Sequence, residues 1–161
     1  MSSSTFVYVA YISATPQELW SALTDTELMR RYWFGLRCES RWTAGSPWKI
    51  VCGDDQILDS GEIVDAVPPR SMLIRWQHQR IPELKAEGPS LCKLELERHA
   101  GAVKLSITHG MARERSKLIE LASGSWPLVI SNLKSLLETG SVVLQHLPQV
   151  RAHSTLEKSH G

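Results

Sequence analysis

The sequence LCKLELERHAGAVKLSITH, residues 91–109, decides the fold. Before the turn at Gly101, apolar residues such as Leu94 alternate with charged residues such as Glu95. After the turn, Leu105 and its neighbours alternate with polar residues in the same way. Alternation with a period of two is typical of a strand that has one buried and one solvated face, as in antiparallel sheets. The stretch therefore predicts an antiparallel hairpin whose apolar face needs a cover.

Five stretches before this hairpin have the composition or the alternation of strands and are bounded by turn residues. They are Phe6–Ser13, Leu36–Trp42, Trp48–Cys52, Ile57–Val67 and Met72–His78. Gly61 lies inside the longest of them and predicts a bulge or a kink. Residues 80–89 contain two prolines and a glycine, so we expect an exposed loop there.

Two short helices are predicted after the first strand. Thr15, Pro16 and Glu18 have the spacing of an N-cap, a first helical residue and the partner of a capping box. A second helix is expected from Glu27 to Tyr32, because its apolar residues fall on one side.

The cover for the sheet is expected from residues 116–138, whose apolar residues recur at spacings of three and four. Gly124 and Pro127 fall inside this stretch and predict a kink or a break into two pieces. Thr139 and Gly140 form a natural C-terminal stop.

This order of elements predicts an α+β fold. We expect a curved antiparallel sheet of about six to seven strands, wrapped around the long C-terminal helix, and a hollow between the two. The chain has 161 residues, which is the length of one domain. We place this domain at residues 1–140 and expect residues 141–161 to be a loosely held tail.

Composition and motifs exclude several classes of partner. The formal net charge is +1, whereas proteins that bind nucleic acid or anionic membranes are usually basic. The longest apolar run, Phe6–Ile12, is far shorter than the ~20 residues that span a bilayer. We therefore expect no nucleic-acid partner, no integral membrane association and, without a signal sequence, a cytoplasmic location.

No cofactor, metal or catalytic residue is predicted, because nucleotide-binding, hydrolase and zinc-site spacings are absent. Cys38, Cys52 and Cys92 are widely spaced and odd in number, so we expect them to be reduced.

Tryptophan makes up six of the eleven aromatic residues (6 Trp, 3 Tyr and 2 Phe). Trp76 ends the apolar face of its strand, and Trp126 lies on the helix stripe that should face it. Together with Trp33 they are the candidates for a cavity wall, although large periodic apolar residues are often plain core. The other three have structural assignments: Trp20 to the core, Trp42 and Trp48 to a turn.

His109 is the most informative ionisable residue, because it shares a strand face with Leu105 and Ile107. There it can bond to a ligand or act as a base, or it can be a hydrogen-bonded core histidine. Asp65 alternates with apolar neighbours and is a second candidate for the hollow. The predicted ligand-binding set is Trp33, Ile74, Trp76, Leu94, Leu105, Ile107, His109, Trp126, Ile130 and Leu133.

The chain resembles START-like helix-grip domains (the SRPBCC, birch-pollen-allergen-like superfamily). It is most similar to the AHSA-type branch, which is related to the activator of the ninety-kilodalton heat-shock-protein ATPase. The resemblance rests on the ordered blocks YISATPQELWSALTD (11–25), YWFG (32–35), GSPW (45–48), GEIVDAVPPR (61–70), VKLSITH (103–109) and WPLVISNLKSLL (126–137). It implies a cavity between the sheet and the C-terminal helix. Relatives bind lipids, sterols, polyketides or other apolar molecules, and some are cyclases.

Three functions stay open at this point. The first is a non-enzymatic domain that encloses an apolar or aromatic small molecule. The second is a polyketide cyclase or aromatase, in which His109 or Asp65 moves protons. The third is a protein that stimulates a chaperone ATPase, although the eukaryotic namesake of the branch carries an additional N-terminal domain. A void well below ~300 Å³ would favour interaction with a protein over small-molecule binding.

Overall fold

A computed structural model describes residues 3–145, which form seven strands and four helices. In chain order they are β1 (Ser4–Ile12), α1 (Pro16–Thr24), α2 (Thr26–Tyr32), β2 (Arg37–Ser40), β3 (Pro47–Val51), β4 (Ile57–Val67), β5 (Ser71–His78), α3 (Pro82–Ala86), β6 (Ser90–His99), β7 (Ala102–Met111) and α4 (Lys117–Thr139). The strands form one antiparallel sheet in the order β1-β7-β6-β5-β4-β3-β2. This arrangement confirms the predicted α+β class.

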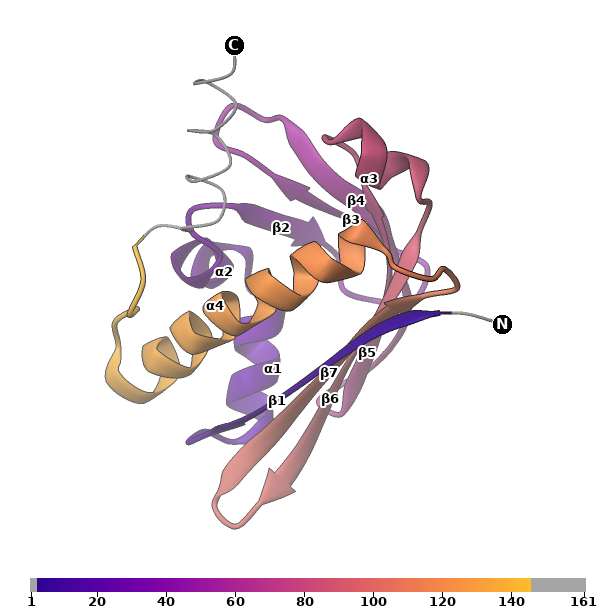
Figure 1. The fold of residues 1–161 in the computed structure, drawn as a ribbon. Helices are drawn as coiled ribbons and strands as arrows, with labels where there is room; N and C mark the ends of the chain where they lie inside the picture. The colour runs from indigo at the N-terminus through magenta and orange to yellow at the C-terminus, as the bar shows by residue number, and fades with distance from the viewer. Residues whose placement is uncertain (1–2, 146–161) are drawn as a thin grey trace.

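The sheet curves around α4, which crosses its concave face (Figure 1). Helices α1 and α2 lie near the C-terminal end of α4, and α3 lies near its N-terminal end (Figure 1). Since Ser4 bonds to Ser116 and Tyr11 to Lys134, α4 and β1 run in the same direction. A position further along α4 therefore lies beside a position further along β1.

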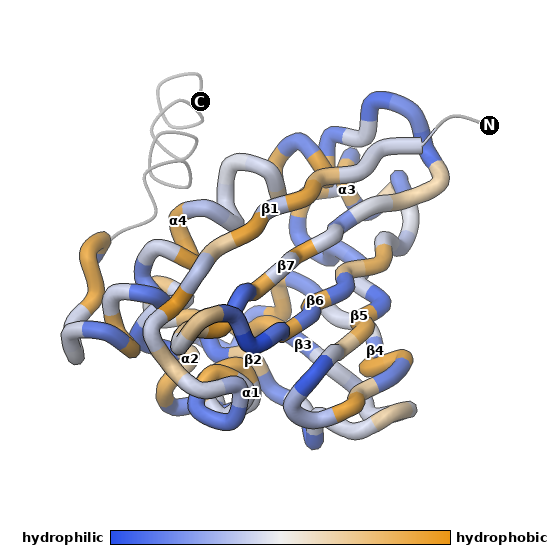
Figure 2. Tube along the Cα trace, turned by 90° about the horizontal axis from the view of Figure 1, so that it is seen from below, coloured by the Kyte–Doolittle hydropathy of each residue, from blue (hydrophilic) through white to orange (hydrophobic). Residues whose placement is uncertain are grey.

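The predicted β6–β7 hairpin is present, and in its register Leu94 lies opposite Ile107 and Leu96 opposite Leu105. All four side chains are buried, and the residues between them on β6 are exposed. Figure 2 shows this alternation of apolar and polar residues along the strands. The period-two pattern therefore identified both the strands and the face that α4 covers.

Local capping explains where the two short helices begin. The Thr15 side chain accepts from the Glu18 backbone, and the Glu18 side chain accepts from Thr15 N, which completes the predicted capping box. Asp25 caps α2 by accepting from Glu27 N and Leu28 N. Both helices therefore begin at side chains that satisfy otherwise unpaired backbone N–H groups.

Helix α4 is continuous from Lys117 to Thr139, so of the two predicted alternatives the break into two pieces is wrong, and the kink stays a prediction. Pro127 removes one backbone donor, but the helix on both sides of it is buried against the sheet through Trp126, Val129 and Ile130. Tertiary packing of this kind supplies most of the stability of a helix in a protein and offsets one missing hydrogen bond. The predicted stop is confirmed, since Gly140 ends the helix with a φ of 88°.

Two other segments differ from the sequence prediction. Residues 80–89, predicted as a loop, contain the short helix α3, with Pro82 in its first turn. The strand predicted over Leu36–Trp42 is limited to Arg37–Ser40, and Trp42 has a φ of 60°, which no strand residue adopts.

Gly61 lies where the backbones of β4 and β5 come close together. A Cβ atom at this position would lie 1.8 Å from the carbonyl oxygen of Arg75, so only glycine fits. The register shift of β4 lies further along, between Ile63 and Asp65. It shifts the alternation after Ile63, so that Asp65 is exposed rather than directed toward the hollow.

Asn132 binds the chain that follows α4. It is fully buried, accepts from Val143 N and Leu144 N, and donates to the carbonyl of Leu144. The first residues of the predicted tail are therefore tied to the domain, and residues 146–161 of that tail lie outside the described residues.

Candidate functional site

Three tryptophans from three elements meet between α4 and the sheet. Trp33 caps the C-terminus of α2, Trp76 lies on β5, and Trp126 lies on the buried face of α4. The ring centroid of Trp126 is 5.4 Å from that of Trp33 and 5.8 Å from that of Trp76, both edge to face. These separations are in the range that aromatic pairs prefer. The sequence analysis proposed these three residues together as a cavity wall, and the structure places them in one cluster.

A fourth tryptophan extends this cluster. Trp48 is buried on β3, and its ring centroid is 4.4 Å from that of Trp76. Trp42 also faces the cluster, as part of a cavity wall. The assignment of Trp42 and Trp48 to a turn was therefore incomplete, because neighbouring strands bring both back to the sheet interior.

Two small cavities lie beside the tryptophans. The narrower has a volume of about 30 Å³ and the wider about 90 Å³. Trp33, Trp76 and Trp126 line both, so these rings stand between the two spaces. The narrower cavity is otherwise lined by Leu23, Met29, Tyr32, Cys38, Trp42, Trp48, Met72, Ile74, Leu94 and Ile130, and the wider by Asp59, His78, His109, Leu118, Leu121, Ala122 and Ser125.

The predicted ligand-binding residues divide between these walls and the solid core. Ile74, Leu94 and Ile130 line the narrower cavity, and His109 lines the wider. Neither of these two cavities is lined by the remaining residues of the predicted set, which are buried in the core: Leu105, Ile107 and Leu133.

His109 is buried and uses both ring nitrogens. Its Nδ1 lies 3.1 Å from Trp126 Nε1, which can only donate, so Nδ1 accepts. Its Nε2 lies 2.8 Å from Ser90 Oγ, and Ser90 Oγ donates to the carbonyl of Trp76. In the neutral ring, Nε2 therefore carries the hydrogen and donates to Ser90. Burial lowers the pKa of His109 to about 4, which agrees with a neutral ring.

This chain of hydrogen bonds argues against nucleophilic or base chemistry at His109. Ser90 Oγ accepts a hydrogen bond from the histidine rather than donating one to it, which is the reverse of an activated serine. A base needs a free lone pair, and the lone pair of Nδ1 is bonded to Trp126. With Asp65 on the exposed face, neither of the proton-transfer residues expected of a cyclase is available in this structure.

A second histidine, missed in the sequence, lines the wider cavity. His78 Nδ1 lies 2.9 Å from Asp59 Oδ1, which also accepts from Trp76 Nε1 at 2.9 Å. Both residues are buried. The signal was present, because alternation places His78 on the same face of β5 as Ile74 and Trp76.

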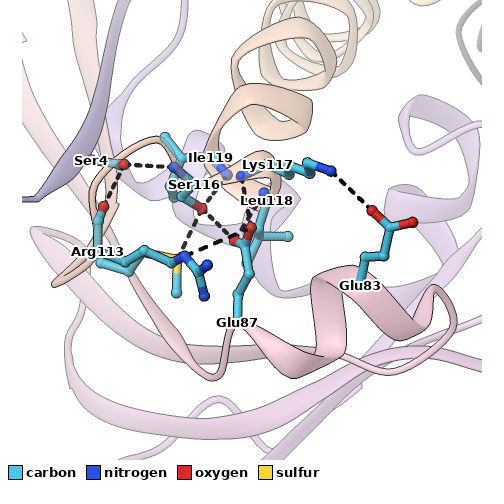
Figure 3. A network of polar contacts seen from close by, with 9 residues as sticks. Ser4, Glu83, Glu87, Arg113, Ser116, Lys117, Leu118 and Ile119 are labelled. Carbon is cyan, nitrogen blue, oxygen red and sulfur yellow. Dashed lines mark hydrogen bonds and ion pairs between the residues drawn. The ribbon is translucent and has the colours of Figure 1, made fainter.

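The helical wall of the wider cavity is fixed at the start of α4. Glu87, which follows α3, accepts from Ser116 Oγ at 2.7 Å, from Lys117 N at 2.9 Å and from Leu118 N at 3.3 Å (Figure 3). Burial alone would raise the pKa of Glu87, but these hydrogen bonds and the charge of Arg113 lower it below its ordinary value. Because Leu118 also lines the cavity, Glu87 holds part of that wall in place.

Within residues 3–145, no group of His, Cys, Asp and Glu residues has the arrangement of a metal site. Over the same residues, no helix is long and apolar enough to cross a membrane. All three cysteines are unpaired, and burial raises the pKa of the Cys38 and Cys92 thiols well above the ordinary value.

A curved seven-stranded antiparallel sheet that holds one long C-terminal helix is the helix-grip arrangement of START-like proteins. The chain belongs to the family described as Activator of Hsp90 ATPase homolog 1-like protein, whose model matches residues 13–138. No curated protein matches the chain.

Several solved structures share this fold. CalU16 from Micromonospora echinospora is 19% identical, with a TM-score of 0.68 over 84% of this chain and 77% of that chain. The Aha1 dimer from Colwellia psychrerythraea is 18% identical, with a TM-score of 0.68 over 85% of this chain and 98% of that chain. PFC0360w, an HSP90 activator from Plasmodium falciparum, is 18% identical, with a TM-score of 0.65 over 83% of this chain and 95% of that chain. At such identities the likeness concerns the fold.

Proposed function

We propose that the protein binds a small apolar or aromatic molecule between α4 and the sheet, beside Trp33, Trp76 and Trp126. The observation that carries this proposal is the meeting of these three rings, from α2, β5 and α4, around two adjoining cavities. Aromatic walls with a few buried polar groups are characteristic of small-molecule sites. The unpaired cysteines agree with the cytoplasmic location that we expect for it.

Cavity size limits the ligand. Sites for drug-sized ligands have volumes from about 300 Å³, well above either cavity. A cavity that binds benzene has about 150 Å³, so the largest ligand that suits these spaces is about one aromatic ring, and its entry requires a wall to move. Trp33 is the tryptophan of the three that is only partly buried, and it precedes Phe34 and Gly35, which have φ values of 58° and 86°.

Titration of tryptophan fluorescence with toluene and with benzene tests this proposal. We expect saturable quenching or a spectral shift in the wild type, and a Kd raised about tenfold by Trp33→Leu, which corresponds to about 1.4 kcal/mol. Trp20→Leu is the matched control, because Trp20 is equally part-buried but lines neither cavity, and it should leave the Kd unchanged. Absence of saturable binding by either ring would contradict the proposal.

A second candidate is a protein-interaction role, which the small cavity volumes favour. Edge strand β1 also presents Val7, Val9 and Tyr11 to solvent, with exposed fractions of 59%, 41% and 46%. Exposed apolar groups on an edge strand are suited to contact with another protein. The family name and the Plasmodium falciparum relative, an HSP90 activator, point to an Hsp90 ATPase as the partner to try.

An ATPase assay with an Hsp90-type chaperone distinguishes this second candidate. If the protein acts through β1, the wild type should raise the ATPase rate and Val9→Lys should abolish the increase. Trp33→Leu should leave the increase intact. An unchanged rate at saturating protein would remove the interaction role.

A further inference from the structure

One residue in the wall of the wider cavity, His78, has a ring nitrogen that the described part of the protein leaves without a hydrogen-bond partner. His78 is 8% exposed, and its Nε2 is closed off from solvent with no hydrogen-bond partner among the described residues. A buried polar atom without a partner lowers stability, so a native structure rarely keeps one without a reason. Because His78 lines the cavity, its Nε2 is a candidate ligand contact once a small movement of the wall exposes it.

Asp59 determines how the His78 ring is held. A carboxylate oxygen accepts hydrogen bonds, so His78 Nδ1 donates to Asp59 Oδ1, and Trp76 Nε1 donates to the same oxygen. The bond at Nδ1 fixes the orientation of the ring and leaves Nε2 as the atom with spare bonding capacity. An oriented imidazole with one free nitrogen is suited to bind a polar group of a ligand.

His109 provides the contrast within the same cavity wall. Its Nδ1 accepts from Trp126 and its Nε2 donates to Ser90, so neither nitrogen is left for a ligand. Of the two histidines that line the wider cavity, His78 alone can add a hydrogen bond.

The chemistry of Nε2 and of the walls selects the class of ligand. A hydroxyl group can donate to the lone pair of neutral Nε2 or accept from its N–H when the ring is charged, so a hydroxyl suits both forms. The remaining wall is aromatic or aliphatic, from Trp33, Trp76, Trp126 and Leu118. A cavity of about 150 Å³ holds benzene, so the 90 Å³ space takes one ring only when its walls move outward.

We propose that the wider cavity binds a single-ring phenolic compound, and that His78, oriented by Asp59, hydrogen bonds to the hydroxyl group. This inference rests on the proposed binding function and names its substrate class. It also assigns different roles to the two buried histidines, His78 to the ligand and His109 to the fold.

Paired titrations with phenol and toluene test the inference, because the two rings differ in the hydroxyl and methyl groups. We expect phenol to bind the wild type at least as tightly as toluene. His78→Leu should lower the affinity for phenol about tenfold and leave toluene unchanged or tighter, so toluene reports that the variant still folds. His99→Leu removes an exposed histidine at the end of β6 and should change neither affinity.

Imidazole nitrogen resonances give a second readout that needs no variant. Phenol should shift the His78 Nε2 signal in the wild type much more than either His109 nitrogen, and toluene should shift all of these signals only slightly.

The outcomes separate the two levels of the proposal. If toluene binds but the phenol-to-toluene affinity ratio is the same in wild type and His78→Leu, the phenolic inference is wrong and the binding function stands. If neither ring binds, both are wrong. A His78 signal that phenol does not move would also overturn the assignment of the hydroxyl to His78.

Discussion

The two ends of the interface between α4 and the sheet are packed differently. The aliphatic end, formed by Ile12, Val103, Leu105 and Leu133, is closed, and each of these side chains is at most 1% exposed. The aromatic end, formed by Trp33, Trp76, His78, His109 and Trp126, is held partly by N–H hydrogen bonds and borders two small, partly open cavities. Branched aliphatic side chains interlock at native density, whereas large flat rings leave gaps that their rigidity prevents them from filling. We infer that the aliphatic end contributes more to stability and that the aromatic end provides room for a ligand.

The largest effect on stability is expected at the aliphatic end. Leu133→Ala removes a fully buried side chain on α4 and should lower the free energy of unfolding by about 3 kcal/mol, as for other buried leucines. Chemical denaturation measures this difference. Toluene affinity, measured under conditions where the variant is folded, should change less than it does in Trp33→Leu. A loss below about 1 kcal/mol would show that this end is not closely packed.

A smaller loss is expected from Trp126→Phe at the aromatic end. The substitution leaves His109 Nδ1 as a buried acceptor without its donor, at a cost of about 2 kcal/mol. It also replaces an indole with a smaller ring and so enlarges the wider cavity. We expect lower stability by denaturation together with unchanged or tighter binding of single-ring ligands. Parallel losses of stability and affinity would remove the distinction between the two ends.

The smallest effect is expected at the Glu87 cap of α4. Glu87→Gln should cost about 1 kcal/mol near pH 7, because the charge at the helix N-terminus is lost. The pKa of Glu87 is lowered in the folded state, so its contribution is present above the pKa of the unfolded chain and is lost as pH falls through the folded pKa. Denaturation midpoints of wild type and variant should therefore converge on acidification.

Glu83→Gln is the matched control for this cap. Glu83 forms an exposed ion pair with Lys117, and such pairs contribute little to stability. Its effect should be smaller than that of Glu87→Gln. If the two substitutions lower stability equally, the contacts of Glu87 in Figure 3 act only as surface charge and do not cap the helix or support the cavity wall.

The same two ends explain how far the sequence could be interpreted. Period-two and helical spacing identified the strands, the inner face of β7 and the stripe of α4, because burial forces these patterns. The tryptophan set followed from the same logic, since Trp76 and Trp126 lie on faces that must meet. The aliphatic end was therefore predictable as core, although Leu105, Ile107 and Leu133 were assigned to a cavity wall that other residues form.

Long-range pairing determined what the sequence could not show. Asp59 meets His78 only because β4 pairs with β5 in one register, and the shift after Ile63 decides that Asp65 is exposed. The His109 network joins β7, β6 and α4, and no spacing in the chain encodes which nitrogen accepts. The volume of a cavity depends on how rigid rings fit together. The sequence therefore predicted a hollow but not its volume.

The most direct test of a ligand site at the aromatic end is a backbone amide NMR titration with toluene. We predict saturable 1:1 shifts concentrated at Trp33, Trp76, Ala122 and Trp126, with little change at Leu105 and Leu133 or on the exposed face of β1. The account would be contradicted by shifts that do not saturate, or by shifts centred on Val7 and Val9.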